Sequence, residues 1–121
     1  LWSCSVKQEL KDIWTTAMES GRYIYTDTEL RSSKGPNVCC SLGVLMMECG
    51  YNPDDHENQW NNEEPGDVGY DPECTEAIPS YTILDSWGID HDIANSIAKA
   101  NDANEGKNGY ADVIKYIKEN L

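Results

Sequence analysis

Carboxylates are the most numerous groups in this chain that could bind a ligand, and most of them lie in one stretch. No Lys or Arg occurs between Lys34 and Lys99. Thirteen of the 22 acidic residues fall in this interval, and they are Glu48, Asp54, Asp55, Glu57, Glu63, Glu64, Asp67, Asp71, Glu73, Glu76, Asp85, Asp90 and Asp92. The nine other acids are matched by nine Lys and Arg, so the formal net charge of -13 arises from this stretch. Because nucleic-acid phosphates and anionic lipids repel such a chain, we expect it to bind neither directly.

A divalent metal site is one use for these carboxylates. Hard cations such as Ca²⁺ bind clustered carboxylate and amide oxygens. The candidate ligands are Asp54, Asp55 and Glu57, and Asn58 and the Glu63–Glu64 pair follow closely. The D-x-D-x-D-G spacing of an EF-hand calcium loop is missing, however. A solvated acidic loop without a metal is the alternative interpretation.

Binding to a basic surface on a protein partner is a second possible role of the same acidic residues. Carboxylates spaced along one rigid face can imitate nucleic-acid phosphates and occupy a basic groove, as phage-encoded acidic inhibitors of restriction enzymes do. The residues expected to contact such a partner are Asp54, Asp55, Glu57, Trp60, Glu63, Glu64 and Asp67. The alternative is that the acidity serves only to keep the protein soluble.

A thiol nucleophile is the third possibility. The five cysteines are an odd number and no secretion signal is evident, which favours reduced thiols, and no C-x2-C pair indicates zinc. Cys40 follows an extended segment and precedes a predicted helix, a position that lowers a thiol pKa. The segment resembles the D-C-S-G turn of the NlpC/P60 cysteine peptidases. Their H-V-G segment has its counterpart in Asp67-Val68-Gly69, which lacks the histidine, so only His56 and His91 could act as the base. Otherwise the thiol is a buried core residue.

A small-molecule site is the fourth possibility. The chain has neither a G-x-G-x-x-G motif nor a phosphate-binding loop with its lysine, so no nucleotide and no other cofactor is expected. An aromatic pocket could form from Trp14, Trp60 and Trp87, although packing in the core is the usual role of such residues.

The elements that must position these groups are mostly helices. Apolar residues recur at helical spacing after Ser5, from about Cys39 to Cys49, after Asp90 and from about Asn108 to Leu121. Ser5, Asp90 and Asn108 are the predicted N-cap residues of three of these helices. A short helical turn follows Pro79-Ser80, and residues 22 to 26 alternate as in a strand. We therefore predict one α+β domain over residues 1 to 121, dominated by helices, with a small antiparallel sheet around residues 22 to 40.

A long acidic loop from about residue 50 to 79 interrupts these elements. Loops beyond about 15 residues without secondary structure are uncommon in compact domains and are often functional or disordered. This one carries nine of the thirteen acids together with Tyr51, Trp60 and Tyr70. Because aromatic rings are costly to leave in water, we expect a folded-back loop pinned by Trp60.

The order of short sequence blocks resembles that of small uncharacterised phage and prophage proteins. These share a W-x-x-A-L-x-S-G-x-Y block, a C-C-L-G-V-L block and an F-x-x-I-A helix at the end. The counterparts here are Trp14 to Tyr23, Leu30-Arg31, Cys39 to Leu45, Trp87 to Ile89, Ala100 to Asp102 and Tyr110 to Ile117. Ser41 interrupts the C-C-L-G pattern, and Tyr110 stands where Phe is usual. The resemblance implies a phage or bacterial origin and a single domain, but no particular reaction.

Two residues of these blocks have a predicted structural role. Gly43 inside a helix indicates close packing against another element. Arg31 is the base nearest to the acidic half and is expected to form a structural ion pair rather than to bind an anionic ligand.

The sequence therefore favours a non-enzymatic accessory protein that binds a protein partner through its acidic loop. Counter-defence or host modulation, in a bacterial or phage-infected cytoplasm, is the expected class. A cysteine hydrolase that uses Cys40 and a divalent-metal-binding module are the alternatives. No apolar run is long enough for a membrane-spanning helix.

Overall fold

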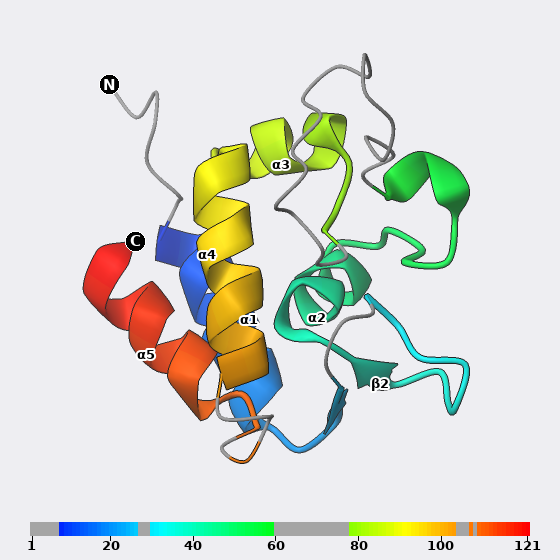
Figure 1. Ribbon diagram of the computed structural model, residues 1–121, viewed down its shortest axis with the longest axis horizontal. Coiled ribbons are helices and arrows are strands. Elements are labelled where there is room, and N and C mark those ends of the chain that lie inside the picture. The colour runs from blue at the N-terminus through cyan, green and yellow to red at the C-terminus, as the bar shows by residue number, and fades with distance from the viewer. Residues whose placement is uncertain (1–7, 27–29, 60–77, 104–106, 108) are drawn as a thin grey trace.

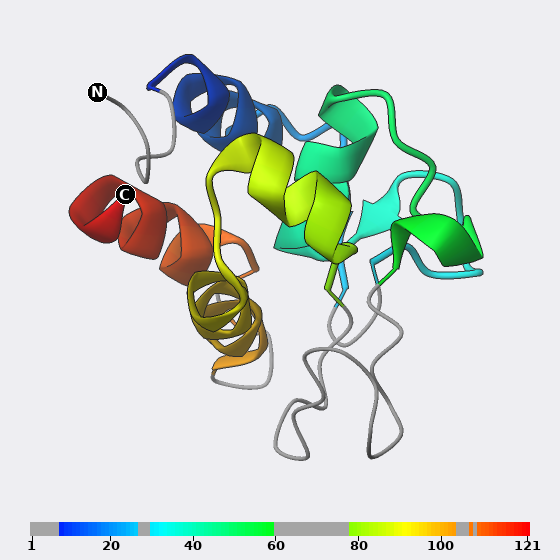
Figure 2. The same cartoon turned by 90° about the horizontal axis from the view of Figure 1, so that it is seen from above.

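The computed structural model describes residues 8–26, 30–59, 78–103, 107 and 109–121, with only the backbone of His56. Its elements are α1 (Gln8–Glu19), β1 (Ile24–Tyr25), β2 (Val38–Cys39), α2 (Ser41–Glu48), the short 3-10 helix η1 (His56–Asn58), α3 (Tyr81–Trp87), α4 (His91–Asp102) and α5 (Ala111–Asn120). Figures 1 and 2 show how they are arranged. The prediction of a helix-dominated α+β domain is confirmed.

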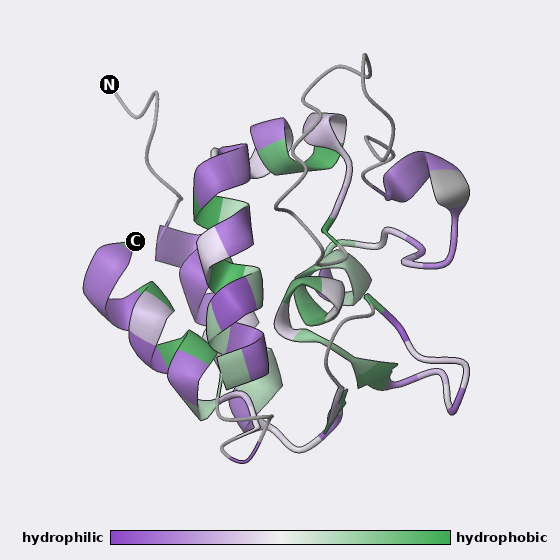
Figure 3. Ribbon diagram, in the orientation of Figure 1, coloured by the Kyte–Doolittle hydropathy of each residue, from purple (hydrophilic) through white to green (hydrophobic). Residues whose placement is uncertain are grey.

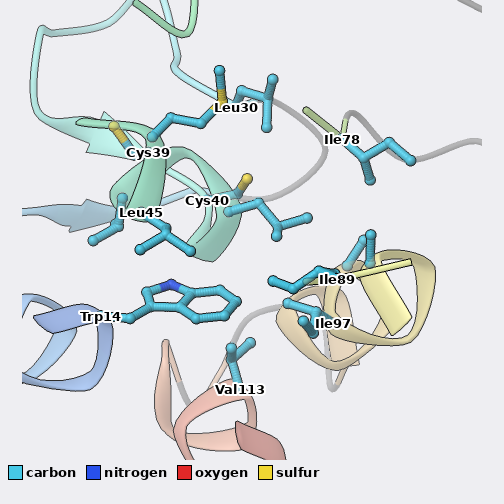
Figure 4. Close-up of a cluster of buried hydrophobic side chains, with 14 of the residues drawn as sticks. Trp14, Leu30, Cys39, Cys40, Leu45, Ile78, Ile89, Ile97 and Val113 are labelled. Atoms are coloured by element: carbon cyan, nitrogen blue, oxygen red, sulfur yellow. The ribbon is translucent and has the colours of Figure 1, made fainter. Parts of the chain in front are cut away.

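Four helices form a closed ring of contacts around one core. Helix α1 packs against α2 and α5, and α4 packs against the same two helices. The close-up in Figure 4 shows Trp14 of α1, Leu45 of α2, Ile97 of α4 and Val113 of α5 meeting in this core. All four side chains are fully buried, as the helical spacing of apolar residues in each segment predicts.

Helix α2 differs from the others because it is buried on almost every side. Its first six residues, Ser41 to Met46, are all buried. Figure 3 shows green and pale residues around α2, whereas α1, α4 and α5 carry purple, hydrophilic outer faces. A helix that is apolar all round belongs in the centre of a domain, and α2 supplies the central element here.

Gly43 makes this central position possible. A Cβ atom at residue 43 would lie 1.7 Å from the backbone oxygen of Leu30, far inside van der Waals contact. The chain at Leu30 therefore crosses α2 at a distance that only glycine permits. The predicted close packing of Gly43 against another element is confirmed.

The two strands are parallel, so the prediction of an antiparallel sheet is wrong. Ile24 pairs with Val38 and Tyr25 with Cys39 in the same direction. The antiparallel partner of Cys39 is Arg31, on the other side of β2. The Gly35-Pro36-Asn37 turn reverses the chain relative to Arg31, as its sequence indicates, but β1 lies at the opposite edge and runs the same way as β2.

The predicted helix ends are only partly right. Asp90 caps α4, and its Oδ1 accepts a hydrogen bond from the backbone N–H of Ile93 at 2.8 Å. Helix α5 begins at Ala111 with Tyr110 as the N-cap residue, three residues after the predicted cap Asn108, which lies outside the described residues along with Ser5. Within the part of the chain described, no helix is both long and apolar enough to cross a membrane.

Candidate functional site

The base of the long acidic loop is a compact, hydrogen-bonded structure, which we call the neck and define as residues 52–59 and 78–80. Gln59 and Pro79 form an antiparallel bridge, so the chain leaves and returns at one place. The backbone N–H of Ser80 donates a hydrogen bond to the carbonyl of Asn58 at 2.8 Å. Gln59 Nε2 donates another to the carbonyl of Pro53, also at 2.8 Å. These bonds join the two ends of the loop.

Two buried apolar residues attach the neck to the helices. Pro53 lies on the outgoing side and Ile78 on the returning side, and both side chains are fully buried. Figure 4 shows Ile78 beside the core cluster, across from Cys40 and Leu45 of the α2 region. Helix α3 begins two residues after Pro79, so the neck and α3 are continuous along the chain.

Arg31 fixes the start of the neck. Its Nε and Nη2 donate to a single oxygen of Asp54, at 3.1 Å and 2.5 Å, and Nη2 also donates to Oδ1 of Asn52 at 3.0 Å. The Arg31 side chain is only 19% exposed, whereas that of Asp54 is 57% exposed. The Asp54 carboxylate raises the pKa of the Arg31 guanidinium above its ordinary value. These contacts agree with the predicted ion-pair role of Arg31.

Of the next two acids, Asp55 lies immediately before the 3-10 helix η1 and Glu57 lies within it. Oδ1 of Asp55 accepts a hydrogen bond from the backbone N–H of Glu57 at 3.1 Å, and the N–H of Asn58 bonds to the carbonyl of Asp55 at 2.9 Å. Both Asp55 and Glu57 are exposed. Of the predicted partner-binding residues, the structure thus brings Asp54, Asp55 and Glu57 together, while Trp60, Glu63, Glu64 and Asp67 lie outside the described residues. The predicted pinning by Trp60 lies outside them too.

The metal-ligand candidates do not form a binding cluster. In the described ranges, no three His, Cys, Asp or Glu side chains gather as a metal ion requires. Asp54 is instead engaged by Arg31, and Asp55 by the backbone of η1.

The thiol of Cys40 is placed in the core rather than in an open site. Cys40 is the N-cap residue of α2, as the predicted helix start implies, but it is only 5% exposed. Burial raises the pKa of this thiol to about 12, and the amides of Gly43 and Leu42 offset the effect only in part. Burial likewise raises the pKa of Cys39 to about 11. At neutral pH both groups are protonated thiols, which are poor nucleophiles.

Of the two candidate bases, His91 is the one whose side chain the structure describes. His91 opens α4 beside Asp90, at the end of the chain turn that follows α3. The groups that shift the pKa of Cys39 and Cys40 include Arg31, Asp54 and Asp102, but no histidine. The backbone of His56 lies in η1 on the neck, and its side chain is outside the described set.

The tryptophans of the proposed aromatic pocket serve the core where they are described. Trp14 is fully buried and donates its indole N–H to the carbonyl of Ser41 at 2.8 Å. Trp87 is buried against Tyr51, with ring centroids 6.3 Å apart in an edge-to-face arrangement.

The neck itself carries acids without any Lys or Arg, whereas α1 and α5 carry charges of both signs. Lys11, Lys115 and Lys118 lie on these two helices, together with Glu9, Asp12, Glu19, Asp112 and Glu119. Both views place η1 and the neck away from α1 and α5 (Figures 1 and 2). Apart from Arg31, whose charge is engaged by Asp54, the neck is built from a stretch without any Lys or Arg.

Sequence reasoning missed the amides that build the neck. The side-chain oxygen of Asn52 accepts hydrogen bonds from both Arg31 and the backbone N–H of Asp54, and the Gln59 amide donates to the carbonyl of Pro53 within the outgoing side of the neck. The Asn52-Pro53-Asp54 triplet is a combination of turn-forming residues, and it is the sequence signal that indicates a structured turn at the start of the loop.

Comparison with known proteins yields one match. Neither the curated proteins nor the solved structures include a significant match to this chain. The model of a family described as a domain of unknown function, DUF8296, matches residues 6–118. Since this match spans nearly the whole chain, the protein belongs to the DUF8296 family.

Proposed function

We propose that this domain is a non-enzymatic accessory protein that binds a basic surface on a protein partner through its acidic end. The observation that carries the proposal is the neck, which holds Asp54, Asp55 and Glu57 on a fixed scaffold. Carboxylates can imitate the spacing of phosphates only when they are held along a rigid face, and a free chain does this poorly. The hydrogen bonds that hold the carboxylates of Asp54 and Asp55 support this proposal.

The distribution of charge supports the same proposal. Among the described residues, the neck acids have one ion pair, Arg31 with Asp54. Six further acids of the loop follow in the sequence between Trp60 and Ala77 without a base. A field of one sign steers a positively charged partner and raises the association rate, with a strong dependence on salt. It also repels nucleic acid, so the partner is a protein.

The burial of Cys40 favours binding over hydrolysis. A catalytic cysteine needs a lowered pKa and an imidazole within hydrogen-bond reach, whereas this thiol is buried and its pKa is raised to about 12. Our proposal includes a phage or bacterial origin, a cytoplasmic location, and a role in counter-defence or host modulation.

The test begins with affinity capture from bacterial lysate at low and high salt. The captured partner is then purified and titrated calorimetrically against the protein and two double variants. Asp55→Asn with Glu57→Gln removes two charges from the neck. The matched control, Glu9→Gln with Glu119→Gln, removes two exposed charges from α1 and α5.

We expect the neck variant to weaken binding about tenfold and the control to change it less than twofold, because close charge pairs contribute more than remote ones. If both double variants weakened partner binding equally, binding would depend on the net charge of the protein and not on the neck acids. Failure to find a partner, together with turnover of a small substrate, would contradict the proposal.

A further inference from the structure

A second acidic feature lies at the corner between α3 and α4, separate from the neck. It is a shallow pocket of about 210 Å³ lined by Tyr81, Leu84, Asp85, Gly88, Ile89, Asp90 and His91. Small-molecule sites usually have volumes of about 300–1,000 Å³. The pocket is therefore small for a cofactor or a drug-sized ligand and suits a single long side chain.

Helical spacing brings the pocket residues together. Tyr81 and Asp85 are four residues apart on α3, so they lie on one face of this helix. Gly88 ends the helix with φ 74°, a left-handed conformation that turns the chain sharply toward α4. Asp90, the N-cap residue of α4, lies on the far side of the turn. The carboxylates of Asp85 and Asp90 therefore come from different elements.

The two sides of the pocket differ in chemistry. Leu84 and Ile89 are buried and form an apolar floor, while Tyr81 is 68% exposed. Asp85 and Asp90 are both exposed, and the described residues supply neither with an ion-pair partner. Asp90 uses one oxygen to cap α4, and its charge remains at the pocket. Such a site combines an aromatic ring, an apolar base and two anions.

An arginine side chain matches this combination better than a lysine does. The flat guanidinium stacks on an aromatic ring and donates several hydrogen bonds in one plane, whereas the ammonium of lysine is compact and strongly hydrated. We infer that the α3–α4 pocket binds an arginine side chain of the protein partner. This inference rests on the proposed function and identifies one anchor residue of the partner.

The position of the pocket fits an anchor within the same interface. The returning side of the neck leads directly into α3 through Ser80, whose N–H is bonded to Asn58. Tyr81, which lines the pocket, is thus the first helical residue after the neck.

The test compares oligo-arginine and oligo-lysine peptides of equal length, measured by fluorescence anisotropy. We expect oligo-arginine to bind about threefold more tightly or better, which is the fold-change that a modest cation–π contact produces. Tyr81→Leu and Asp85→Asn should abolish this preference, and oligo-arginine alone should shift the amide resonances of Gly88 and Ile89. The control Asp92→Asn removes an exposed charge from α4 outside the pocket and should weaken both peptides equally.

The outcomes separate the two proposals. Equal affinities for the two peptides, or a preference that survives in Tyr81→Leu, would overturn the pocket assignment and leave the neck untouched. If neither peptide binds at low salt, the proposed function itself is contradicted. If arginine amide alone binds as tightly as the peptide, the pocket is a small-molecule site and the inference of a protein anchor is wrong.

Discussion

Asn101, near the end of α4, accepts a hydrogen bond from the backbone N–H of Ser41, the first residue of α2, at 3.0 Å. The two residues are 60 positions apart in the chain. The Asn101 side-chain amide also donates to the carbonyl of Thr26 at 3.2 Å, and the backbone carbonyl of Asn101 accepts from the Tyr25 hydroxyl. One side chain, only 2% exposed, thus joins α4, the start of α2 and the end of β1.

Replacement of Asn101 by leucine should therefore destabilise the fold strongly. The change leaves the buried N–H of Ser41 and the partly buried carbonyl of Thr26 without these partners, and each lost partner costs up to about 1–3 kcal/mol. We expect the free energy of unfolding, measured in urea, to fall by about 2–5 kcal/mol. Asn120→Ala on the exposed end of α5 is the control and should change it by less than about 0.5 kcal/mol. Similar values for the two variants would show that the buried amide network contributes little.

Gly43→Ala is expected to destabilise the protein although alanine normally favours a helix by about 1 kcal/mol. The new methyl group would collide with the Leu30 oxygen, which belongs to the backbone and has little freedom to move. Overpacking of this kind costs about 1–3 kcal/mol or more. Thermal unfolding should show a clear drop in Tm, with exposed Thr16→Ala of α1 unchanged. A Tm that rises would mean that Leu30 does not lie against α2.

The cysteines should differ sharply in reactivity. Cys49 is exposed at the end of α2, whereas Cys39 and Cys40 are buried with raised pKa values. In a Cys4→Ser, Cys74→Ser background, we expect one thiol to react readily with Ellman's reagent and two to react only after unfolding. Adding Cys49→Ser should remove the ready reaction. Fast modification of Cys40 in the folded protein would restore the cysteine-hydrolase interpretation.

Glu48 should contribute to stability in a pH-dependent way. Its carboxylate accepts from the Tyr23 hydroxyl at 2.6 Å and from Arg22 at 2.8 Å, and these two partners lower its pKa below the ordinary 4.5. Because the pKa of Glu48 is lower in the folded than in the unfolded state, its contribution to the free energy of unfolding is complete at pH values above the unfolded-state pKa. This contribution is lost as the pH falls through the folded-state pKa.

We therefore expect Glu48→Gln to lose less stability than the unaltered protein between neutral pH and about pH 3. Urea unfolding at several pH values measures the difference. Glu119→Gln, an exposed carboxylate near the end of α5, serves as the control and should keep the original pH dependence. Parallel curves for Glu48→Gln and the unaltered protein would show that the Tyr23 and Arg22 contacts are absent in solution.

Local sequence patterns predicted much of the scaffold. The helical spacing of Trp14, Leu45, Ile97 and Val113 identified the core faces, because burial on one side of a helix leaves a period that can be read directly. Asp90 as a cap and Gly43 as a contact point were likewise readable, since capping and close approach each demand a particular residue type. The separation of charge along the chain was equally plain.

Long-range contacts were beyond the reach of those patterns. The direction of β1 relative to β2 depends on which edge of β2 each neighbour occupies, and no short motif encodes that choice. The sequence pattern of a cysteine before a helix is the same for an exposed and for a buried thiol. The burial of Cys40, which raises its pKa, arises from tertiary packing. Asn101 shows no signal in its own segment, because its partners Ser41 and Thr26 come from distant parts of the chain.

By itself, the sequence determined the helices, their buried faces and the concentration of negative charge in one stretch, because these follow from residue type and local spacing. Only the tertiary structure decided that Cys40 is buried, that the strands are parallel, and that the neck holds Asp54, Asp55 and Glu57 on a fixed base. These features arise where segments far apart in sequence, such as Arg31 with Asp54 and Gln59 with Pro79, meet in space.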